Sequence, residues 1–227
     1  VGFDPATFNA YMTEDRADGC LYRFVPANQD QPFVGKLWAL AVAGRPRLET
    51  ALDMSPGTRV TVEWVEVKEP APKEDTVRLQ AHELGAAKFR RGEGAFFHAG
   101  ALYFATTLGG RKDRGQIFKL NLGNDGKADE LELLAESPNA DVLDSPDNIT
   151  VAPWGHVLMA EDGADGNFLR GLTPEGYVYD IAFNAGGPGE LAGPCFSPDG
   201  SALFLNLFLE GKTVAIQGPF SSLGRPA

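Results

Sequence analysis

The chain has 227 residues, a formal net charge of −11 and a hydrophobic fraction of 43%. This hydrophobic fraction, with only 22% charged residues, indicates a folded protein with a sizeable core rather than a disordered one. No apolar run approaches the roughly 18–20 residues that a membrane span requires, so we expect no membrane partner. The acidity disfavours a nucleic-acid partner, which would need a basic surface, and is compatible with binding of multivalent cations.

Gly and Pro residues divide the chain into many short aromatic and β-branched segments, a pattern typical of all-β proteins. In chain order, the expected strands are 20–25, 36–43, 59–67, 101–107, 116–122, 130–135, 149–153, 156–161, 168–172, 177–183, 202–208 and 212–217. One insertion interrupts this series. Its proline-rich part at 69–74 predicts a loop, and the following segment at 74–88 predicts a helix.

A unit made of a turn, a hydrophobic strand and a small or acidic end recurs four times, at 3–15, 98–107, 152–162 and 197–206. Aligned on Tyr11, Tyr103, Leu158 and Phe204, the units are 92, 55 and 46 residues apart. The two shorter spacings fit the roughly 40–50 residues of a β-propeller blade, and the long one fits a blade with an insertion. A β-sandwich is the alternative, but it does not explain why the unit recurs.

The fold we expect is therefore a partial β-propeller that fills 1–227 as a single domain. Its expected parts are a blade at 1–68, the loop and helix insertion at 69–90, and further blades at 91–136, 137–185 and 186–227. Because the innermost strands of a propeller line a central channel, the ends of the repeated strands should converge there. Carboxylates gathered in one cavity repel each other unless cations lie among them, and oxygen ligands without His or Cys suit calcium.

Five short motifs occur in series: TEDR at 13–16, RGEG at 91–94, PDN at 146–148, AED at 160–162 and SPDG at 197–200. With the segments around them, from Val1 to about Phe220, the sequence resembles the C-terminal part of the PhoX family of calcium-dependent alkaline phosphatases. The resemblance implies a six-bladed propeller with iron and calcium ions in its channel. It also implies hydrolysis of phosphate monoesters, in the periplasm or after secretion.

The resemblance assigns expected roles to individual residues. Arg91 matches an arginine that contacts the substrate phosphate, and Glu14 and Glu93 match metal ligands. The other expected metal ligands match the calcium end of the cluster: Asp147, Asn148, Glu161, Asp162 and Glu190. Clustered cations and a planar guanidinium both stabilise the negative charge of phosphoryl transfer, which supports these roles on physical grounds.

The chain departs from the family pattern in one respect: neither Cys20 nor Cys195 matches the family's iron-ligating cysteine, which lies in the N-terminal part. About four blades cannot close a six-bladed ring, so we expect the N-terminal remainder of the same protein to be a required partner. An inactive remnant is the alternative. Two other functions also stay open: a calcium-dependent lactonase or organophosphate hydrolase, and a non-catalytic propeller module stabilised by cations.

Overall fold

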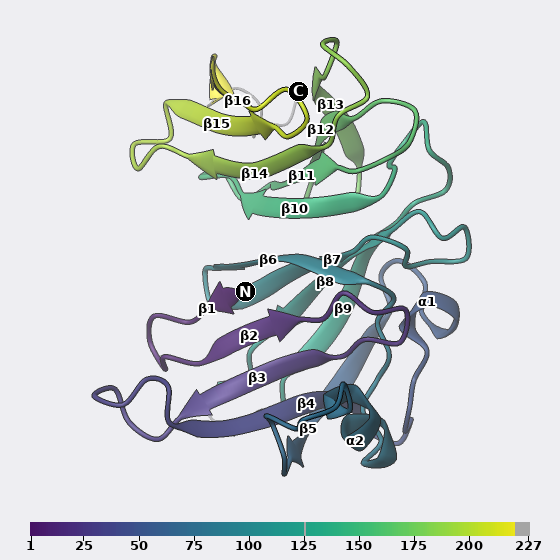
Figure 1. Cartoon of the computed structure of the whole chain (residues 1–227), viewed down its shortest axis with the longest axis vertical. Coiled ribbons are helices and arrows are strands. Elements are labelled where there is room, and N and C mark those ends of the chain that lie inside the picture. Colours follow the sequence, from purple (N-terminus) through teal and green to yellow (C-terminus); the bar gives the residue numbers. More distant parts are fainter. Residues whose placement is uncertain (125, 221–227) are drawn as a thin grey trace.

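The computed structural model describes residues 1–124 and 126–220, and over these residues the chain is nearly all β (Figure 1). The all-β prediction is confirmed. The last predicted blade, 186–227, runs beyond the described residues at 221–227. Neither of the helices in the described part of the chain has the length and apolar character needed to cross a membrane.

The largest sheet has nine strands in the order β1-β2-β3-β4-β5-β9-β8-β7-β6. Its strands are β1 (Gly2–Phe3), β2 (Ala10–Thr13), β3 (Leu21–Pro26), β4 (Gly35–Val42), β5 (Arg59–Val67), β6 (Gly92–His98), β7 (Ala101–Thr106), β8 (Gln116–Asn121) and β9 (Glu130–Glu136). β1 and β2, at one end of the sheet, lie beside β6 at the other end, so the sheet curls back on itself. Two antiparallel meanders, β2–β5 and β6–β9, thus form one continuous unit.

The two meanders, which cover the predicted blades at 1–68 and 91–136, are joined at their outer strands. β5 pairs with β9, and Arg59 lies opposite Glu132 in this ladder. The guanidinium of Arg59 lies 3.2 Å from the Glu132 carboxylate, and opposite charges on facing strand positions favour the pairing.

Two smaller sheets complete the structure. The second contains β10 (Pro146–Val151), β11 (Val157–Glu161), β12 (Phe168–Leu172) and β13 (Val178–Phe183), and the third contains β14 (Leu191–Phe196), β15 (Ala202–Leu207) and β16 (Lys212–Gln217). Of the two helices, α2 (Val77–Glu83) lies within the predicted insertion, whereas α1 (Thr50–Asp53) was not predicted. α2 ends before Gly85, whose φ of +95° suits glycine and stops the helix.

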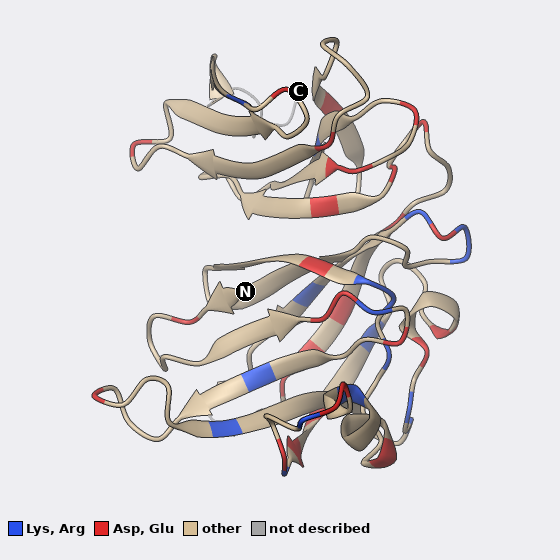
Figure 2. Ribbon diagram, viewed as in Figure 1, with Lys and Arg blue, Asp and Glu red and all other residues tan. Residues whose placement is uncertain are grey.

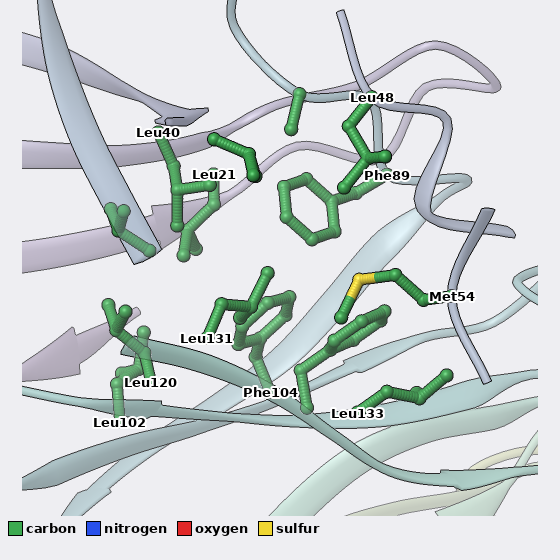
Figure 3. Packing of buried hydrophobic residues seen from close by; sticks show 14 of the residues in the cluster. Leu21, Leu40, Leu48, Met54, Phe89, Leu102, Phe104, Leu120, Leu131 and Leu133 are labelled. Atoms are coloured by element: carbon green, nitrogen blue, oxygen red, sulfur yellow. The ribbon is translucent and has the colours of Figure 1, made fainter. Parts of the chain in front are cut away.

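Hydrophobic cores fill the spaces between successive sheets. The largest lies inside the curled nine-stranded sheet, where the rings of Phe104 and Phe118 stack at 5.0 Å and Phe89 meets both edge-on. Figure 3 shows Leu40, Met54, Leu131 and their neighbours pointing into this space. Further clusters join β7–β9 to the second sheet and the second sheet to the third. This serial packing of antiparallel sheets is the propeller-type fold that the sequence predicts.

The first strand of each meander was harder to predict than the second. The strand predictions include neither β6 nor β14, and they begin three residues late for β10. These strands contain Gly92 and Gly94, Pro146, or Gly193 and Pro194, and glycine and proline are disfavoured in strands. Each also carries an irregular register against its neighbour, within Gly92–Ala95, Pro146–Asn148 and Ala192–Cys195.

The repeat alignment is consequently one strand out of register. Tyr103, Leu158 and Phe204 lie on β7, β11 and β15, the second strands of their meanders, whereas Tyr11 lies on β2. The first strands of the later meanders contact one another, β6 with β10 and β10 with β14. The ends of three of the repeated units nevertheless lie around Arg91, which binds the Asp15 carboxylate, accepts the Thr107 amide at its carbonyl oxygen and feels the charge of Asp162. The regular hydrophobic pattern belongs to β7 and β11 because they are buried on both faces, as adjacent residues show at Phe104 and Ala105 and at Leu158 and Met159.

Candidate functional site

The candidate site lies where β6 of the first sheet meets β10 of the second. Figure 2 shows acidic segments on both of these neighbouring strands. Close approach depends on Gly94: a Cβ at this position would lie 2.5 Å from the carbonyl oxygen of Asp147 and 2.6 Å from the amide nitrogen of Ile149. No side chain fits there, so the glycine lets the two backbones touch beside Glu93 and Asp147.

Glu93 and Asp147 occupy equivalent places in their strands. Each lies in the irregular part of the ladder, and such bulges redirect side chains, often next to active sites. Each strand is also preceded by a residue in the left-handed region, Arg91 at φ 53° and Ser145 at φ 52°. Non-glycine residues rarely adopt this conformation, and strained backbone of this kind recurs at functional sites.

Equivalent hydrogen bonds hold these two residues in place. The carbonyl oxygen of Arg91 accepts the Thr107 amide at 2.9 Å, and that of Ser145 accepts the Asp162 amide at 3.0 Å. Asp162 is thereby fixed at the entrance to β10. The two halves of the site are thus built on one local pattern, repeated in neighbouring sheets.

Five carboxylates gather at this place, those of Asp15, Glu93, Asp147, Asp162 and Glu190, and they shift one another's pKa values. Burial, followed by the neighbouring Glu93 carboxylate, raises the pKa of Asp147 to about 6. Burial, followed by the interaction with Asp147, raises the pKa of Glu190 to about 7. Burial, followed by the neighbouring Asp15 carboxylate, raises the pKa of Glu93, and burial raises the pKa of Asp162. The pKa values of carboxylates rise in this way when the groups are partly shielded from water and repel each other.

The cluster is not a complete metal site by itself. Within residues 1–124 and 126–220, no group of three or more Asp, Glu, His or Cys side chains lies close enough to hold a metal ion. The donor set nevertheless fits a hard cation, because Glu93, Asp147, Asp162 and Glu190 all offer oxygen atoms.

Arg91 lies beside this acidic cluster and is held by an acid from another segment. Its Nε donates to Oδ1 of Asp15 at 2.6 Å and its Nη2 donates to Oδ2 at 2.9 Å. The hydrogen bonds with Asp15 raise the pKa of Arg91, and Glu93 and Asp162 raise it further. Arg91 therefore brings positive charge to the edge of the cluster.

Comparison with known proteins shows the family and the fold of this chain. The family model for alkaline phosphatase PhoX matches residues 1–211. The chain belongs to the PhoX family. Among solved structures, it is similar to Pseudomonas fluorescens PhoX in complex with vanadate, a transition state analogue, with 18% identity and a TM-score of 0.67. The alignment covers 90% of this chain and 47% of that structure, so the chain spans about half the length of its PhoX relative.

Weaker likenesses extend to other solved structures. Virginiamycin B lyase from Staphylococcus aureus is 14% identical with a TM-score of 0.42, over 96% of this chain and 68% of the lyase. A putative gluconolactonase is 12% identical with a TM-score of 0.41, over 95% of this chain and 76% of its own. No relative among the curated protein sequences matches the chain. The PhoX structure thus supports the fold, and the family model supports the family.

Three of the predicted PhoX site residues lie outside the carboxylate cluster or have other partners. The Glu14 carboxylate accepts the Cys20 amide at 3.1 Å and the Tyr22 hydroxyl at 2.8 Å. The Asn148 side-chain oxygen accepts the Gly193 amide at 2.7 Å, which links β10 to β14.

Glu161 is the third of these residues, and the structure does not bring its carboxylate to the cluster. This side chain is fully buried on β11. It accepts hydrogen bonds from the amides of Asp144 and Phe168 and from Nε of Arg170. These contacts are those of a residue that holds neighbouring segments together.

Both cysteines are free thiols, Cys20 buried and Cys195 exposed. Burial, followed by the charge of Glu14, raises the pKa of Cys20 to about 12. Cys20 is therefore held as a neutral thiol, and the carboxylate cluster lacks a sulfur ligand from either residue.

Sequence reasoning found one part of the site and missed another. The glycines on each side of Glu93 indicate close backbone approach, and Gly94 makes such a contact with Asp147. The contact of Asp15 with Arg91 was not predicted, because 76 positions separate the two residues and no spacing rule links them.

Proposed function

We propose that this chain is part of a metal-dependent phosphomonoester hydrolase of the PhoX type, which acts in the periplasm or outside the cell. The observation that carries the proposal is the position of Arg91 at the edge of a carboxylate cluster, within charge–charge range of Glu93 and Asp162. An arginine recognises phosphate oxygens, and carboxylates hold the cations that a phosphoryl group requires.

Calcium fits the carboxylates of this site best. Glu93, Asp147, Asp162 and Glu190 would hold it, since a cation among them relieves the repulsion that raises their pKa values. Glu14, Asn148 and Glu161 remain proposed ligands from the resemblance, each of which would have to exchange a present hydrogen bond for a cation. Iron belongs to the proposal as a second metal, for which this chain supplies carboxylates and the remainder of the protein a thiolate.

The chain's own residues would bind and orient the ester. When bound, the cations neutralise charge on the phosphoryl group and lower the pKa of water. Arg91 would donate hydrogen bonds to phosphate oxygens and stabilise the charge that accumulates during transfer. Glu93 and Asp147 would fix the ligand positions, because bulged strands in contact at Gly94 leave them little freedom.

In our proposal, phosphatase activity requires the N-terminal remainder of the protein as well as this chain. The chain spans about half of the PhoX structure that it matches. The proposed blades at 1–68, 91–136, 137–185 and 186–227 would form part of a six-bladed ring, and the N-terminal remainder would complete it and its ligand set.

The test is Glu93→Ala in the metal-loaded protein, assayed with p-nitrophenyl phosphate and by elemental analysis. We expect turnover to be abolished and metal content to fall, whereas Glu63→Ala, at an exposed position on β5, should change neither. Full activity and full metal content in Glu93→Ala would contradict the proposal. Wild-type protein that contains calcium without iron and leaves phosphate esters intact would favour the lactonase or binding-module alternatives.

A further inference from the structure

Asp15 is a residue to which the proposed function gives no task, although it makes the most specific contact of Arg91. Both of its carboxylate oxygens accept hydrogen bonds from the guanidinium, at 2.6 and 2.9 Å. This two-bonded arrangement fixes the plane of the guanidinium as well as its position. Asp15 follows β2, whereas Arg91 precedes β6, so the contact joins two separate segments.

The arrangement leaves one edge of Arg91 free. Asp15 occupies Nε and Nη2, and within residues 1–124 and 126–220 no hydrogen bond of Nη1 to a protein acceptor is found. The Arg91 side chain is 42% exposed, and its Nη1 is not among the buried polar atoms of the described residues that lack a partner. The Arg91 backbone is fixed as well, because its amide donates to the Arg16 carbonyl at 2.8 Å. Both ends of the side chain are therefore held while its remaining donors are available.

We propose that Asp15 is a positioning residue that holds the Arg91 guanidinium with its Nη1 edge directed toward the anionic substrate. The inference rests on the proposed function and deepens it. Without Asp15, the arginine would sample many rotamers and would turn toward the carboxylates of Glu93 and Asp162. With Asp15, its orientation is set before the substrate arrives, which is how preorganised sites gain affinity.

The experiment is a double-mutant cycle with Asp15→Asn, Arg91→Ala and the double variant in the metal-loaded protein. It measures steady-state kinetics with p-nitrophenyl phosphate, inhibition by inorganic phosphate and metal content. For Asp15→Asn we expect KM and the inhibition constant of phosphate to rise about tenfold, in the range for a lost charge-assisted contact, with metal content unchanged. In the Arg91→Ala background, Asp15→Asn should have no further effect, because Asp15 acts through Arg91.

A matched control lies at the preceding residue. Nη1 of Arg90 donates to Oδ1 of Asp113 at 2.7 Å, and Asp113 is exposed away from the cluster. Asp113→Asn removes one charge from a similar pair, and asparagine tolerates the left-handed backbone at this position. We expect this variant to keep the wild-type KM and inhibition constant.

Three results would overturn the inference. Asp15→Asn could leave KM and phosphate inhibition unchanged, its effect could multiply with that of Arg91→Ala, or it could lose metal, which would make Asp15 a ligand. If Asp15→Asn does not fold, Asp15→Glu shifts the guanidinium by one methylene, and an unchanged phosphate constant would overturn the inference.

Failure of the proposed function gives a different result. Wild-type protein that binds inorganic phosphate without hydrolysing p-nitrophenyl phosphate would contradict the function. Weaker phosphate binding by Asp15→Asn, measured by calorimetry, would still support the positioning role. Wild-type protein that binds no phosphate would overturn the positioning role.

Discussion

The Cα of Gly94 lies against the backbone of Asp147, so close that a Cβ would come within 2.5 Å of the carbonyl oxygen. This contact joins the first sheet to the second at the carboxylate cluster. The spacing of Glu93 from Asp147 therefore depends on the absence of a side chain between them.

Gly94→Ala should separate β6 from β10. We expect a loss of about 1–3 kcal/mol in the free energy of unfolding, as for other overpacked positions, together with reduced metal content. Denaturant unfolding and elemental analysis measure these effects. Gly218→Ala adds the same methyl group where no atom lies within 4 Å and should cost little. Equal effects of the two variants would show that the contact at Gly94 is not required.

Phe104→Ala should remove the centre of the largest core. Phe104 is fully buried and packs against Phe118 and Phe89. We expect a loss of about 3–5 kcal/mol in the free energy of unfolding, the usual range for a buried phenylalanine. Phe33→Ala is the matched control, because this ring is 94% exposed. A small effect at Phe104 would contradict the packing shown in Figure 3.

The metal-free protein should become less stable as the pH rises from about 4 to about 7. The folded-state pKa values of Asp147 and Glu190, about 6 and about 7, exceed the values of about 4 expected in the unfolded chain. The folded state therefore binds more protons in this window, and its stability falls as they are released. Thermal unfolding across this range, with and without calcium, measures the effect.

Calcium should reduce this dependence and raise the melting temperature, because it binds the ionised carboxylates of the folded state. Glu190→Gln removes one of the carboxylates with a raised pKa, so the stability of the metal-free protein should depend less on pH. A metal-free profile that rises with pH over the same window would contradict the prediction.

Glu161→Gln tests whether this residue serves the fold or a metal. The Arg170 side chain is only 4% exposed, and without the Glu161 carboxylate its buried Nε loses its charged partner, while Asp180 still pairs with Nη1. We expect a loss of about 3–5 kcal/mol in the free energy of unfolding. Elemental analysis at a temperature where the variant is folded separates the roles. Unchanged metal content would make Glu161 structural, and loss of metal with little change in stability would support a ligand.

The sequence predicts most of the fold where side chains follow a regular pattern. The strands with alternating or fully buried hydrophobic residues, such as those around Tyr103 and Leu158, were found, and so was α2. The strands of the site, β6 and β10, were harder to predict because their glycine and proline residues interrupt the hydrophobic pattern of a strand. Glu93 stands between two glycines, and Asp147 and Asn148 follow a proline. The pairing of β5 with β9 depends on contacts between segments more than 60 residues apart, which local patterns do not reveal.

For the site, the sequence indicated which residues take part better than it indicated how they are placed relative to one another. The motifs around Arg91, Glu93 and Asp147 identified residues that the fold brings together. Glu161 stands next to Asp162 in sequence, yet their carboxylates have different surroundings, because β11 ends at Glu161 and Asp162 lies in the segment that follows, where its amide donates to Ser145. Neighbouring residues in one motif can therefore belong to different parts of the structure.

The pairing of β5 with β9 makes the segment from Gly2 to Glu136 one structural unit, which limits how it can be divided in evolution or by engineering. Propeller blades are often treated as modules that can be added or lost one at a time. Here, deletion of either of the first two meanders would expose a strand edge in the other, so Gly2 to Glu136 would have to be gained, lost or transplanted together. The first natural point of separation in the chain is the connection between Glu136 and Pro146.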